Sequence, residues 1–158
     1  MEIGVNWLRR LLSGKPHFVI GGHEDPYMLR WYLIPRNRRL NIYLHKFMRD
    51  DEDRALHDHP WWFISLVLRG AYTEVTDAGE TRREAWSLAY RPATHRHRVV
   101  LDRWIEFFAG TTVIEPCWTV VVTGRKKRTW GFWCPKGFVP WYEFVDDSDT
   151  GNVGKGCD

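Results

Sequence analysis

Long apolar runs are missing from this sequence, and their absence limits where the protein can work. No stretch approaches the roughly eighteen apolar residues that a membrane-spanning helix needs. The N-terminal residues also lack the continuous apolar segment and the small-residue cleavage site of a signal peptide. We therefore expect a soluble, intracellular protein.

Cysteine is scarce as well. Cys117, Cys134 and Cys157 leave at least one thiol unpaired, and none belongs to a CxxC pair or to a Cys/His cluster with the spacing of a structural zinc site. A reducing compartment fits this usage best, so we expect a cytoplasmic location. Cys134 precedes a proline and has no sequence neighbour that would activate it, which argues against a catalytic thiol.

Other catalytic signatures are absent too. The sequence contains no Gly-rich phosphate loop, no nucleophile elbow and no pair of catalytic carboxylates. The net charge of +3 is too small to indicate a nucleic-acid partner by itself. These absences remove several common enzyme classes from consideration.

Aromatic residues, in contrast, make up 15% of the chain. Broad rings suit the half-buried surface of a pleated sheet or the wall of a ligand pocket. Beyond residue 16, turn signals recur roughly every eight to twelve positions between short apolar segments, which predicts an all-β sandwich or barrel. The predicted strands cover residues 17–20, 28–34, 40–48, 61–68, 71–76, 81–90, 98–101, 104–108, 117–123, 129–133 and 138–144.

Three segments follow from this pattern. Residues 1–15 carry a narrow apolar stripe that ends at Gly14 and Pro16, which predicts a short amphipathic helix packed on the outside of a sheet. Residues 16–145 form the barrel. Residues 146–158 are rich in glycine, acidic and small polar residues, and we expect them to be a flexible tail.

Two histidine pairs with the same spacing stand out. His57 and His59 come directly before the most apolar run of the sequence, and His95 and His97 follow about forty residues later. On a strand, residues two apart share one face, so each pair offers two imidazoles in one direction. Surface or hydrogen-bonded histidines are the ordinary alternative for any single residue, but two such pairs favour a metal site.

The same residues resemble the two motifs of the cupin superfamily. These motifs are HxH followed by a glutamate and a glycine, and a later PxGxxH; here His57-x-His59 and Gly70 resemble the first, and Pro92-x-Thr94-x-x-His97 the second. More closely, the chain resembles small cupin-like proteins of bacteria and phages that have no established reaction. Further residues carry this closer resemblance: Leu44-His45-Lys46-Phe47, Leu56, Asp58, Pro60-Trp61, Arg91, Ala93, Thr123-Gly124 and Trp130-Gly131-Phe132.

The resemblance implies a double-stranded β-helix, a jelly-roll-like barrel, with His57, His59 and His97 as metal ligands. It makes His95 a neighbour or an optional fourth ligand. Phe63 and Ile64 stand where the cupin glutamate would be, so a three-histidine site with open coordination positions is implied, as in the thiol dioxygenases. Such a site suits one divalent transition metal, with Fe(II) favoured and zinc, manganese and nickel as alternatives.

Several side chains are candidates for positions around this site. His45 and Glu74 could orient a ligand ring, although a lone His45 is equally typical of a core residue. Asp58 should lie on the opposite strand face and bind backbone or an arginine. Strand parity places Trp61 and Phe63 along the cavity wall, with Tyr43 also directed inward.

Two basic clusters remain, formed by Arg36, Arg38 and Arg39 and by residues 125–128. Bound phosphate or nucleic acid is one interpretation, and solvated turn charge is the one we favour, because neither run lies in an extended basic stripe.

Three functions therefore stay open. The first is a mononuclear non-haem metalloenzyme, dioxygenase-like, acting on a small polar substrate. The second is a non-catalytic barrel that binds a small molecule or nucleotide, and the third is a phage or host accessory protein that uses the basic clusters. We further expect no membrane association and, by analogy with cupins, a homodimer.

Overall fold

The computed structural model describes residues 2–51, 55–146 and 154–158. Within these three segments, fourteen strands and two short helices follow one another, and all their strand pairs are antiparallel. The elements are α1 (Glu2–Leu12), β1 (Phe18–Ile20), β2 (Met28–Tyr32), β3 (Asn41–Phe47), β4 (Leu56–His57), β5 (Phe63–Arg69), β6 (Tyr72–Thr76), β7 (Gly79–Arg83), β8 (Leu88–Arg91), β9 (His97–Leu101), β10 (Arg103–Ile105), β11 (Thr112–Ile114), β12 (Cys117–Thr123), β13 (Gly131–Cys134), β14 (Gly137–Pro140) and α2 (Trp141–Phe144).

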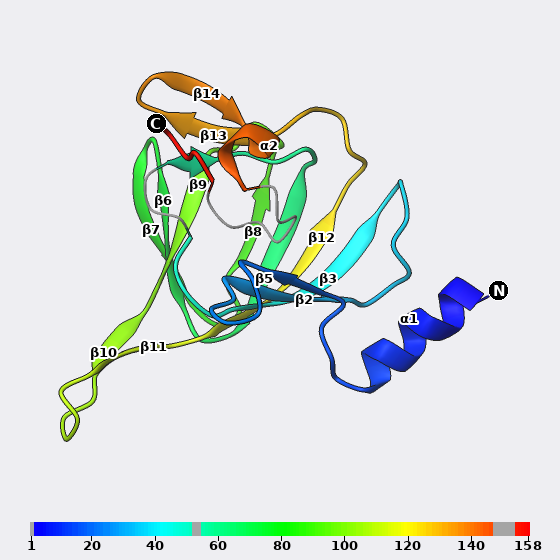
Figure 1. Cartoon of the computed structure of the whole chain (residues 1–158), viewed down its shortest axis with the longest axis horizontal. Coiled ribbons are helices and arrows are strands. Elements are labelled where there is room, and N and C mark those ends of the chain that lie inside the picture. Colours follow the sequence, from blue (N-terminus) through cyan, green and yellow to red (C-terminus); the bar gives the residue numbers. More distant parts are fainter. Residues whose placement is uncertain (1, 52–54, 147–153) are drawn as a thin grey trace.

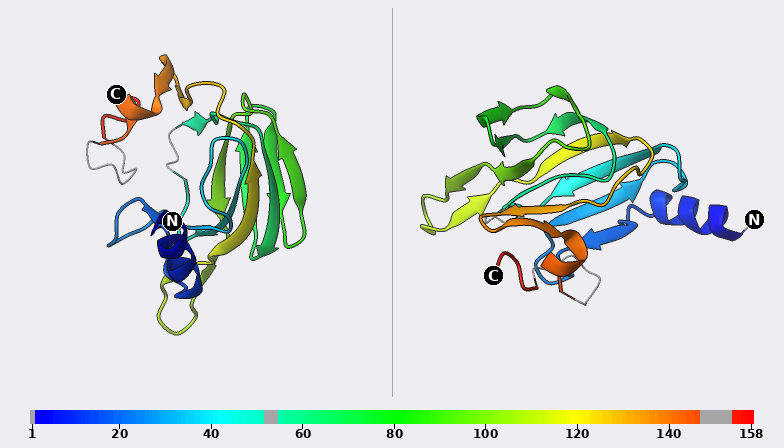
Figure 2. Two further views of the ribbon diagram at one scale, coloured as in Figure 1. Left: turned by 90° about the vertical axis from the view of Figure 1, so that its right-hand side faces the viewer. Right: turned by 90° about the horizontal axis from the view of Figure 1, so that it is seen from above.

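Two six-stranded sheets form the barrel (Figures 1 and 2). One has the order β1-β2-β3-β12-β5-β8 and the other β14-β13-β4-β9-β6-β7, while β10 and β11 form a separate ribbon. Buried and less buried residues alternate along β3, β5, β9 and β12, as expected for strands with one face toward a core. The all-β prediction is confirmed.

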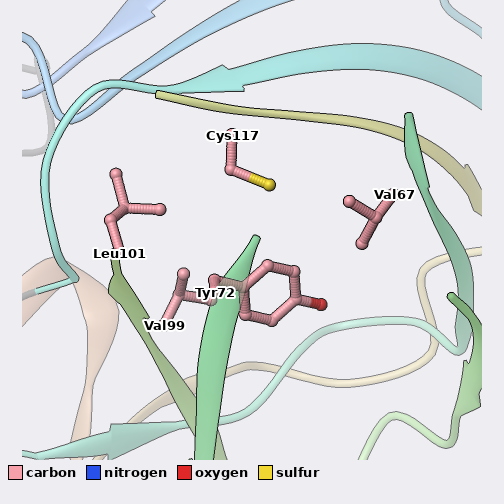
Figure 3. Close-up of a cluster of buried hydrophobic side chains, with 5 residues drawn as sticks. All are labelled: Val67, Tyr72, Val99, Leu101 and Cys117. Atoms are coloured by element: carbon pink, nitrogen blue, oxygen red, sulfur yellow. The ribbon is translucent and has the colours of Figure 1, made fainter. Parts of the chain in front are cut away.

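Side chains from both sheets meet in the core. Val67 of β5 and Cys117 of β12 face Tyr72, Val99 and Leu101 of β6 and β9, and Figure 3 shows the five pointing toward one another. All five are buried, so the cluster removes apolar surface of both sheets from water and holds the sheets together. The opposite end of the barrel has a second cluster around Phe132 and Phe144.

The chain crosses between the sheets directly after His57. The sequence placed His57 and His59 at the mouth of one long strand, whereas β4 ends at His57 in one sheet and β5 begins at Phe63 in the other. The HxH motif therefore spans a strand end and the crossing segment.

Two other predicted strands are wrong in part. Residues 81–90 form not one strand but β7 and β8, because Trp86 adopts a φ of 71° and Ser87 closes a turn onto Glu84 with a hydrogen bond of 2.9 Å. Residues 138–144 divide into β14 and the single helical turn α2.

The N-terminal helix is confirmed as an element, but its packing is looser than predicted. Trp7 donates its indole N–H to the carbonyl of Tyr32 on β2 at 2.7 Å, whereas Leu12 keeps 78% of its surface exposed. In Figure 1 the helix projects beyond the barrel. No helix among the described residues is long and apolar enough to cross a membrane.

The described end of the predicted flexible tail is tied to the barrel. Cys157 forms a disulfide with Cys134 of β13, and the amides of Gly154 and Gly156 donate to the carbonyl of Phe144. Residues 147–153 of the tail lie outside the described residues. A disulfide is unexpected in the reducing setting that the cysteine spacing indicated, because such settings keep thiols reduced.

Candidate metal centre

Strand pairing brings the two histidine motifs together. His57 on β4 lies directly opposite His97 on β9, and side chains at directly opposed positions of an antiparallel pair project from the same face. The ring centroids of His57 and His97 are 4.9 Å apart. Phe132 of β13 lies on the other side of His57 and packs on its ring at 5.8 Å.

His59 reaches the same point from the crossing segment. Its amide donates to the carbonyl of Ala93, just before β9, at 3.1 Å, and its Nε2 lies 2.9 Å from Nε2 of His97. Phe63 packs edge-on against its ring at 4.6 Å. One ring nitrogen each of His57, His59 and His97 lies within 4.8 Å of the others, so these three side chains could hold a metal ion.

Carboxylates face the outer nitrogen of two of these rings. A carboxylate oxygen of Asp51 lies 2.9 Å from Nδ1 of His57, and Oε1 of Glu74 lies 3.0 Å from Nδ1 of His97. A carboxylate at Nδ1 favours the tautomer with the proton on that atom, which leaves the Nε2 lone pair free for a ligand bond. The arrangement is the one that metal-binding histidines commonly show.

Glu74 is the centre of a buried ionic network. It accepts hydrogen bonds from the guanidinium groups of Arg91 and Arg83, and Nε2 of His95 lies 3.1 Å from its Oε1. Glu74 and Arg91 are almost completely buried. A buried charge is tolerated only when it is paired, so this network holds the Glu74 carboxylate against His97.

Glu74, His95 and His97 form a second group whose ligand atoms lie within 4.8 Å of one another. Its carboxylate is already engaged by two arginines, which compete with any cation for the same oxygens. The first group offers three imidazoles, and no arginine or lysine side chain in the described part of the chain hydrogen-bonds to them. The first group is thus the better metal site, with His95 beside it rather than in it.

Protonation of the three histidines is controlled by burial and by the carboxylates. Burial lowers the pKa of His97 to about 4, although the hydrogen bond to Glu74 opposes this shift. Burial and the neighbouring histidines keep the pKa of His59 well below its usual value. For His57, burial acts to lower the pKa, but the Asp51 carboxylate outweighs it and the pKa is raised.

Glu74 shows the complementary effect. Burial acts to raise the pKa of its carboxyl, but the hydrogen bonds from His97 and Arg91 outweigh burial and the net pKa is lowered. Glu74 is therefore ionised at neutral pH, as its place among these donors requires.

Asp58 lies between the two histidines of the HxH motif and points away from the site. One oxygen accepts from Arg128 Nη1 at 2.6 Å and from the indole of Trp133 at 3.1 Å, and the other accepts from the amide of Gly131. The prediction that Asp58 binds backbone or an arginine is confirmed, and Asp58 binds both. These bonds anchor the crossing segment to β13.

The remaining predicted site residues are spread more widely. His45 is buried, accepts a hydrogen bond from Arg30 Nε at 2.9 Å and stacks on Tyr43, and it belongs to neither metal-capable group of the described residues. Burial and the adjacent Arg30 keep its pKa well below the usual value. Phe63 packs on the rings of His59 and His97, whereas Trp61 lines a separate pocket together with Tyr43.

Sequence reasoning missed Asp51 and Arg91. From the sequence, Asp51 has no predicted role, and Arg91 is only a motif residue. The sequence holds only weak signals for these roles: Asp51 precedes His57 by six residues, and Arg91 stands between a predicted strand and Pro92. Neither spacing reveals a contact that depends on how the two sheets close on each other.

The donor set fits a divalent transition metal. Three imidazoles suit zinc, iron, copper and nickel alike, and the two Nδ1-facing carboxylates would raise the basicity of their rings. The group formed by His57, His59 and His97 contains no carboxylate. This agrees with the sequence, in which Phe63 stands where the cupin motif has glutamate. A bound metal would keep more of its positive charge than it would beside a carboxylate ligand.

Comparison with known proteins identifies the fold. No protein-family model matches the chain, and no curated protein matches it. Among solved structures, the DMSP lyase DddQ from Ruegeria pomeroyi aligns with a TM-score of 0.53 at 16% identity, covering 75% of this chain and 57% of that one. A conserved Klebsiella pneumoniae protein with a double-stranded β-helix domain aligns with a TM-score of 0.50 at 14% identity, covering 73% and 90%.

A cupin-2 domain-containing protein from Shewanella frigidimarina aligns at 13% identity with a TM-score of 0.47, over 75% of this chain and 92% of that one. At these identities the likeness concerns the fold and not the activity. The two facing antiparallel sheets and the histidines on their inner side agree with it. The chain therefore has a double-stranded β-helix fold.

Proposed function

We propose that the protein is a mononuclear metalloenzyme in which His57, His59 and His97 hold one divalent transition metal. The observation that carries this proposal is the convergence of three ring nitrogens within 4.8 Å. The carboxylates of Asp51 and Glu74 behind two of the rings support it, because metal-binding histidines usually donate their other ring N–H to such a group.

A catalytic site fits this ligand set better than a structural one. Structural zinc sites use four protein ligands, whereas three protein ligands leave positions for water or substrate. When bound, the metal supplies Lewis-acid or redox chemistry to a substrate in those positions. The protein's own part is to orient the three rings and to exclude bulk water with Phe63, Trp130 and Phe132, which pack around them.

A dioxygenase-like oxidation of a small polar substrate, with Fe(II), is the reaction we favour. The three-histidine ligand set that the cupin resemblance implies, as in the thiol dioxygenases, supports iron, and zinc, manganese and nickel suit the same ligands. The structural neighbour DddQ is a DMSP lyase, so lyase substrates belong in the same activity panel. The cytoplasmic location and the homodimer stay predictions from the sequence.

Metal analysis tests the proposal directly. Protein purified without chelator should carry about one equivalent of metal, and His57→Ala and His97→Ala should each lose most of it. His23→Ala, at an exposed position, is the matched control and should keep the metal. Substoichiometric metal that the two site substitutions leave unchanged would contradict the proposal.

Oxygen uptake then separates an enzyme from a non-catalytic binder. The loaded protein is offered thiols, amino acids and nucleotides, with product analysis alongside the oxygen electrode. Turnover that disappears in His97→Ala supports the enzyme. Binding of a small molecule without turnover of any compound would support the alternative, a metal-containing binding protein.

A further inference from the structure

The two basic clusters of the sequence meet at one end of the barrel. Strands β3 and β12 are antiparallel neighbours, with Asn41 opposite Thr123. The loop before β3 and the loop after β12 therefore leave the sheet side by side, as both views show (Figures 1 and 2). Arg36 and Arg38 lie on the first loop, and Arg125 and Lys126 lie on the second.

These four cationic side chains line a single pocket of about 600 Å³, and its wall contains no acidic residue. This volume is within the range of small-molecule sites. None of the four forms an ion pair with another residue in the described part of the chain. Four positive side chains around one cavity repel each other, and a bound anion would offset this repulsion. The electrostatic potential of the pocket therefore favours an anionic ligand.

The loops that carry the charges are held by internal contacts. On the first loop, the Asn41 side chain accepts from the Asn37 amide at 2.9 Å and donates to the Asn37 carbonyl at 2.9 Å. On the second, Gly124 donates its amide to the carbonyl of Trp62 at 3.0 Å. A Cβ at Gly124 would lie 2.2 Å from the Trp62 indole nitrogen, so only glycine allows this close approach. The loops are thus preorganised, which lowers the entropy cost of binding.

Two aromatic residues complete the pocket wall. Trp61 is half-buried and Tyr43 is buried. The ring of Tyr43 stacks on His45, and its centroid lies 4.9 Å from the guanidinium carbon of Arg30. Indole and phenol rings provide flat faces for a planar ligand group. Trp61 is only two residues beyond His59, so the pocket adjoins the segment that carries a candidate metal ligand.

We propose that this pocket binds the phosphate groups of a small phosphorylated molecule that places a planar group against Trp61. Guanidinium groups bind phosphate oxygens in bidentate fashion, and several of them favour a ligand with more than one negative charge. The further step, that this molecule is the substrate of the histidine centre, rests on the proposed function. It would make phosphorylated compounds, such as nucleotides, the substrate class.

Titration calorimetry with ADP, pyrophosphate and adenosine at fixed ionic strength tests the pocket. ADP and pyrophosphate should bind, and adenosine should not. Arg38→Glu and Lys126→Glu should each weaken ADP binding at least tenfold, because each replaces an attraction by a repulsion. Trp61→Leu should weaken ADP binding and leave pyrophosphate binding within twofold of wild type.

The chain provides matched controls for charge. Arg39 and Lys127 are exposed neighbours on the same two loops that do not line the pocket, so Arg39→Glu and Lys127→Glu make the same change in net charge. Affinity for ADP should change less than twofold in these controls. If ADP affinity falls equally in the pocket variants and the control variants, the proposal is overturned. ADP would then respond to the overall positive charge of the surface and not to a defined binding site.

Two further binding measurements distinguish a nucleotide pocket from a nucleic-acid surface and separate the pocket from the metal centre. A single-stranded oligonucleotide that binds more tightly than ADP and is weakened equally by all four charge changes would overturn the proposal in favour of a nucleic-acid surface. His97→Ala, which should lose the metal, should still bind ADP. If metal-loaded wild type does not bind ADP, the phosphate pocket is contradicted and the metal centre is not. If wild type binds ADP but holds no metal, only the proposed function is contradicted.

Discussion

Glu74 fixes the ring of His97 from behind, with its Oε1 3.0 Å from Nδ1, while Nε2 of the same ring lies 2.9 Å from His59. The two nitrogens of His97 therefore face different partners, a carboxylate on one side and the candidate metal position on the other. Arg91 and Arg83 hold the carboxylate in place. The metal centre thus depends on the ionic network of Glu74, Arg91 and Arg83, although none of these three residues is assigned as a metal ligand.

Glu74→Gln should lower metal affinity roughly 10- to 100-fold, because the amide is a weaker acceptor for the Nδ1 proton. It should also lower the free energy of unfolding by about 3–5 kcal/mol, since Arg91 loses its buried partner. Competition with a chromophoric chelator measures the first effect, and urea unfolding measures the second. Glu80→Gln, on exposed β7, is the control, and an affinity equal to that of this control would contradict the role given to Glu74.

Asp51→Asn tests the other oriented ring. The substitution removes the charge 2.9 Å from Nδ1 of His57, so the raised pKa of His57 should fall, and metal affinity should fall by roughly 10- to 100-fold. Titration of the imidazole signals by NMR in chelator-treated protein gives the pKa. In the exposed control Asp77→Asn both quantities should stay at the wild-type values. A His57 pKa that does not move would show that Asp51 is not its partner in solution.

The metal-free protein should lose stability as pH falls from about 6.5 to about 4. His97 has its pKa lowered from 6.5 to about 4 by burial, so in this window the unfolded chain binds a proton that the folded chain does not. The contribution of His97, roughly 3 kcal/mol for such a shift, is fully present above pH 6.5 and is lost progressively below it. Urea unfolding at several pH values measures the slope.

Two variants make this pH test specific. His97→Gln should have a shallower decline between pH 6.5 and 4, whereas His23→Gln, at an exposed position, should follow the wild-type curve. A wild-type stability that stays constant across this window would contradict the buried, neutral state of His97. Added metal should raise stability at pH 7 and lose this effect as the ligands become protonated.

Local periodicity was enough to predict most of the barrel. Side chains that suit a core alternate with more polar or exposed ones along β3, β5 and β12, because one face of each strand is buried. The resemblance to the cupin motifs implied that His57 and His97 meet, and β4 and β9 do bring the two residues together. These features are encoded within short segments or in a known pattern of spacing.

Contacts that depend on sheet closure could not be predicted. Asp51 meets His57, and Glu74 meets Arg91, only after distant strands have packed. For the same reason the two basic clusters were read separately, although β3 and β12 place them around one pocket. Trp61 was assigned to the metal cavity by parity, but parity fails where the chain crosses between sheets.

The disulfide predicts a specific pattern of thiol reactivity. Native protein should resist alkylation, because Cys134 and Cys157 are bonded and burial raises the pKa of the Cys117 thiol to about 12. Unfolded protein should accept one label without reductant and three with it, as counted by mass spectrometry. Three labels without reductant would show that the bond is absent in the isolated protein.

Removing the bond should destabilise the barrel. Cys157→Ser opens a link between residues 23 apart in sequence, and such links typically contribute about 2–4 kcal/mol. The free energy of unfolding of Cys157→Ser should match that of wild type in reductant. A variant as stable as oxidised wild type would mean that the C-terminal end adds nothing to the fold.

Asp58 provides a comparison between a buried and a surface carboxylate that each bind an arginine. Asp58 is fully buried and accepts from Arg128, Trp133 and Gly131, whereas Asp102 binds Arg82 at the surface through two hydrogen bonds of 2.8 and 2.6 Å. In Asp58→Asn the amide group would replace one acceptor oxygen and face donors, so stability should fall by about 2–4 kcal/mol. Asp102→Asn should cost less than about 1 kcal/mol, because solvent screens the surface pair.

The same pair of variants shows whether the crossing segment matters to the metal. Asp58 holds this segment between His57 and His59, so metal affinity should fall in Asp58→Asn although the side chain points away from the centre. Asp102→Asn should bind metal as wild type does. If both variants are equally stable and bind metal equally well, the Asp58 contacts play no part in forming the site, and His59 must be positioned by its amide hydrogen bond to Ala93 and by its packing on Phe63.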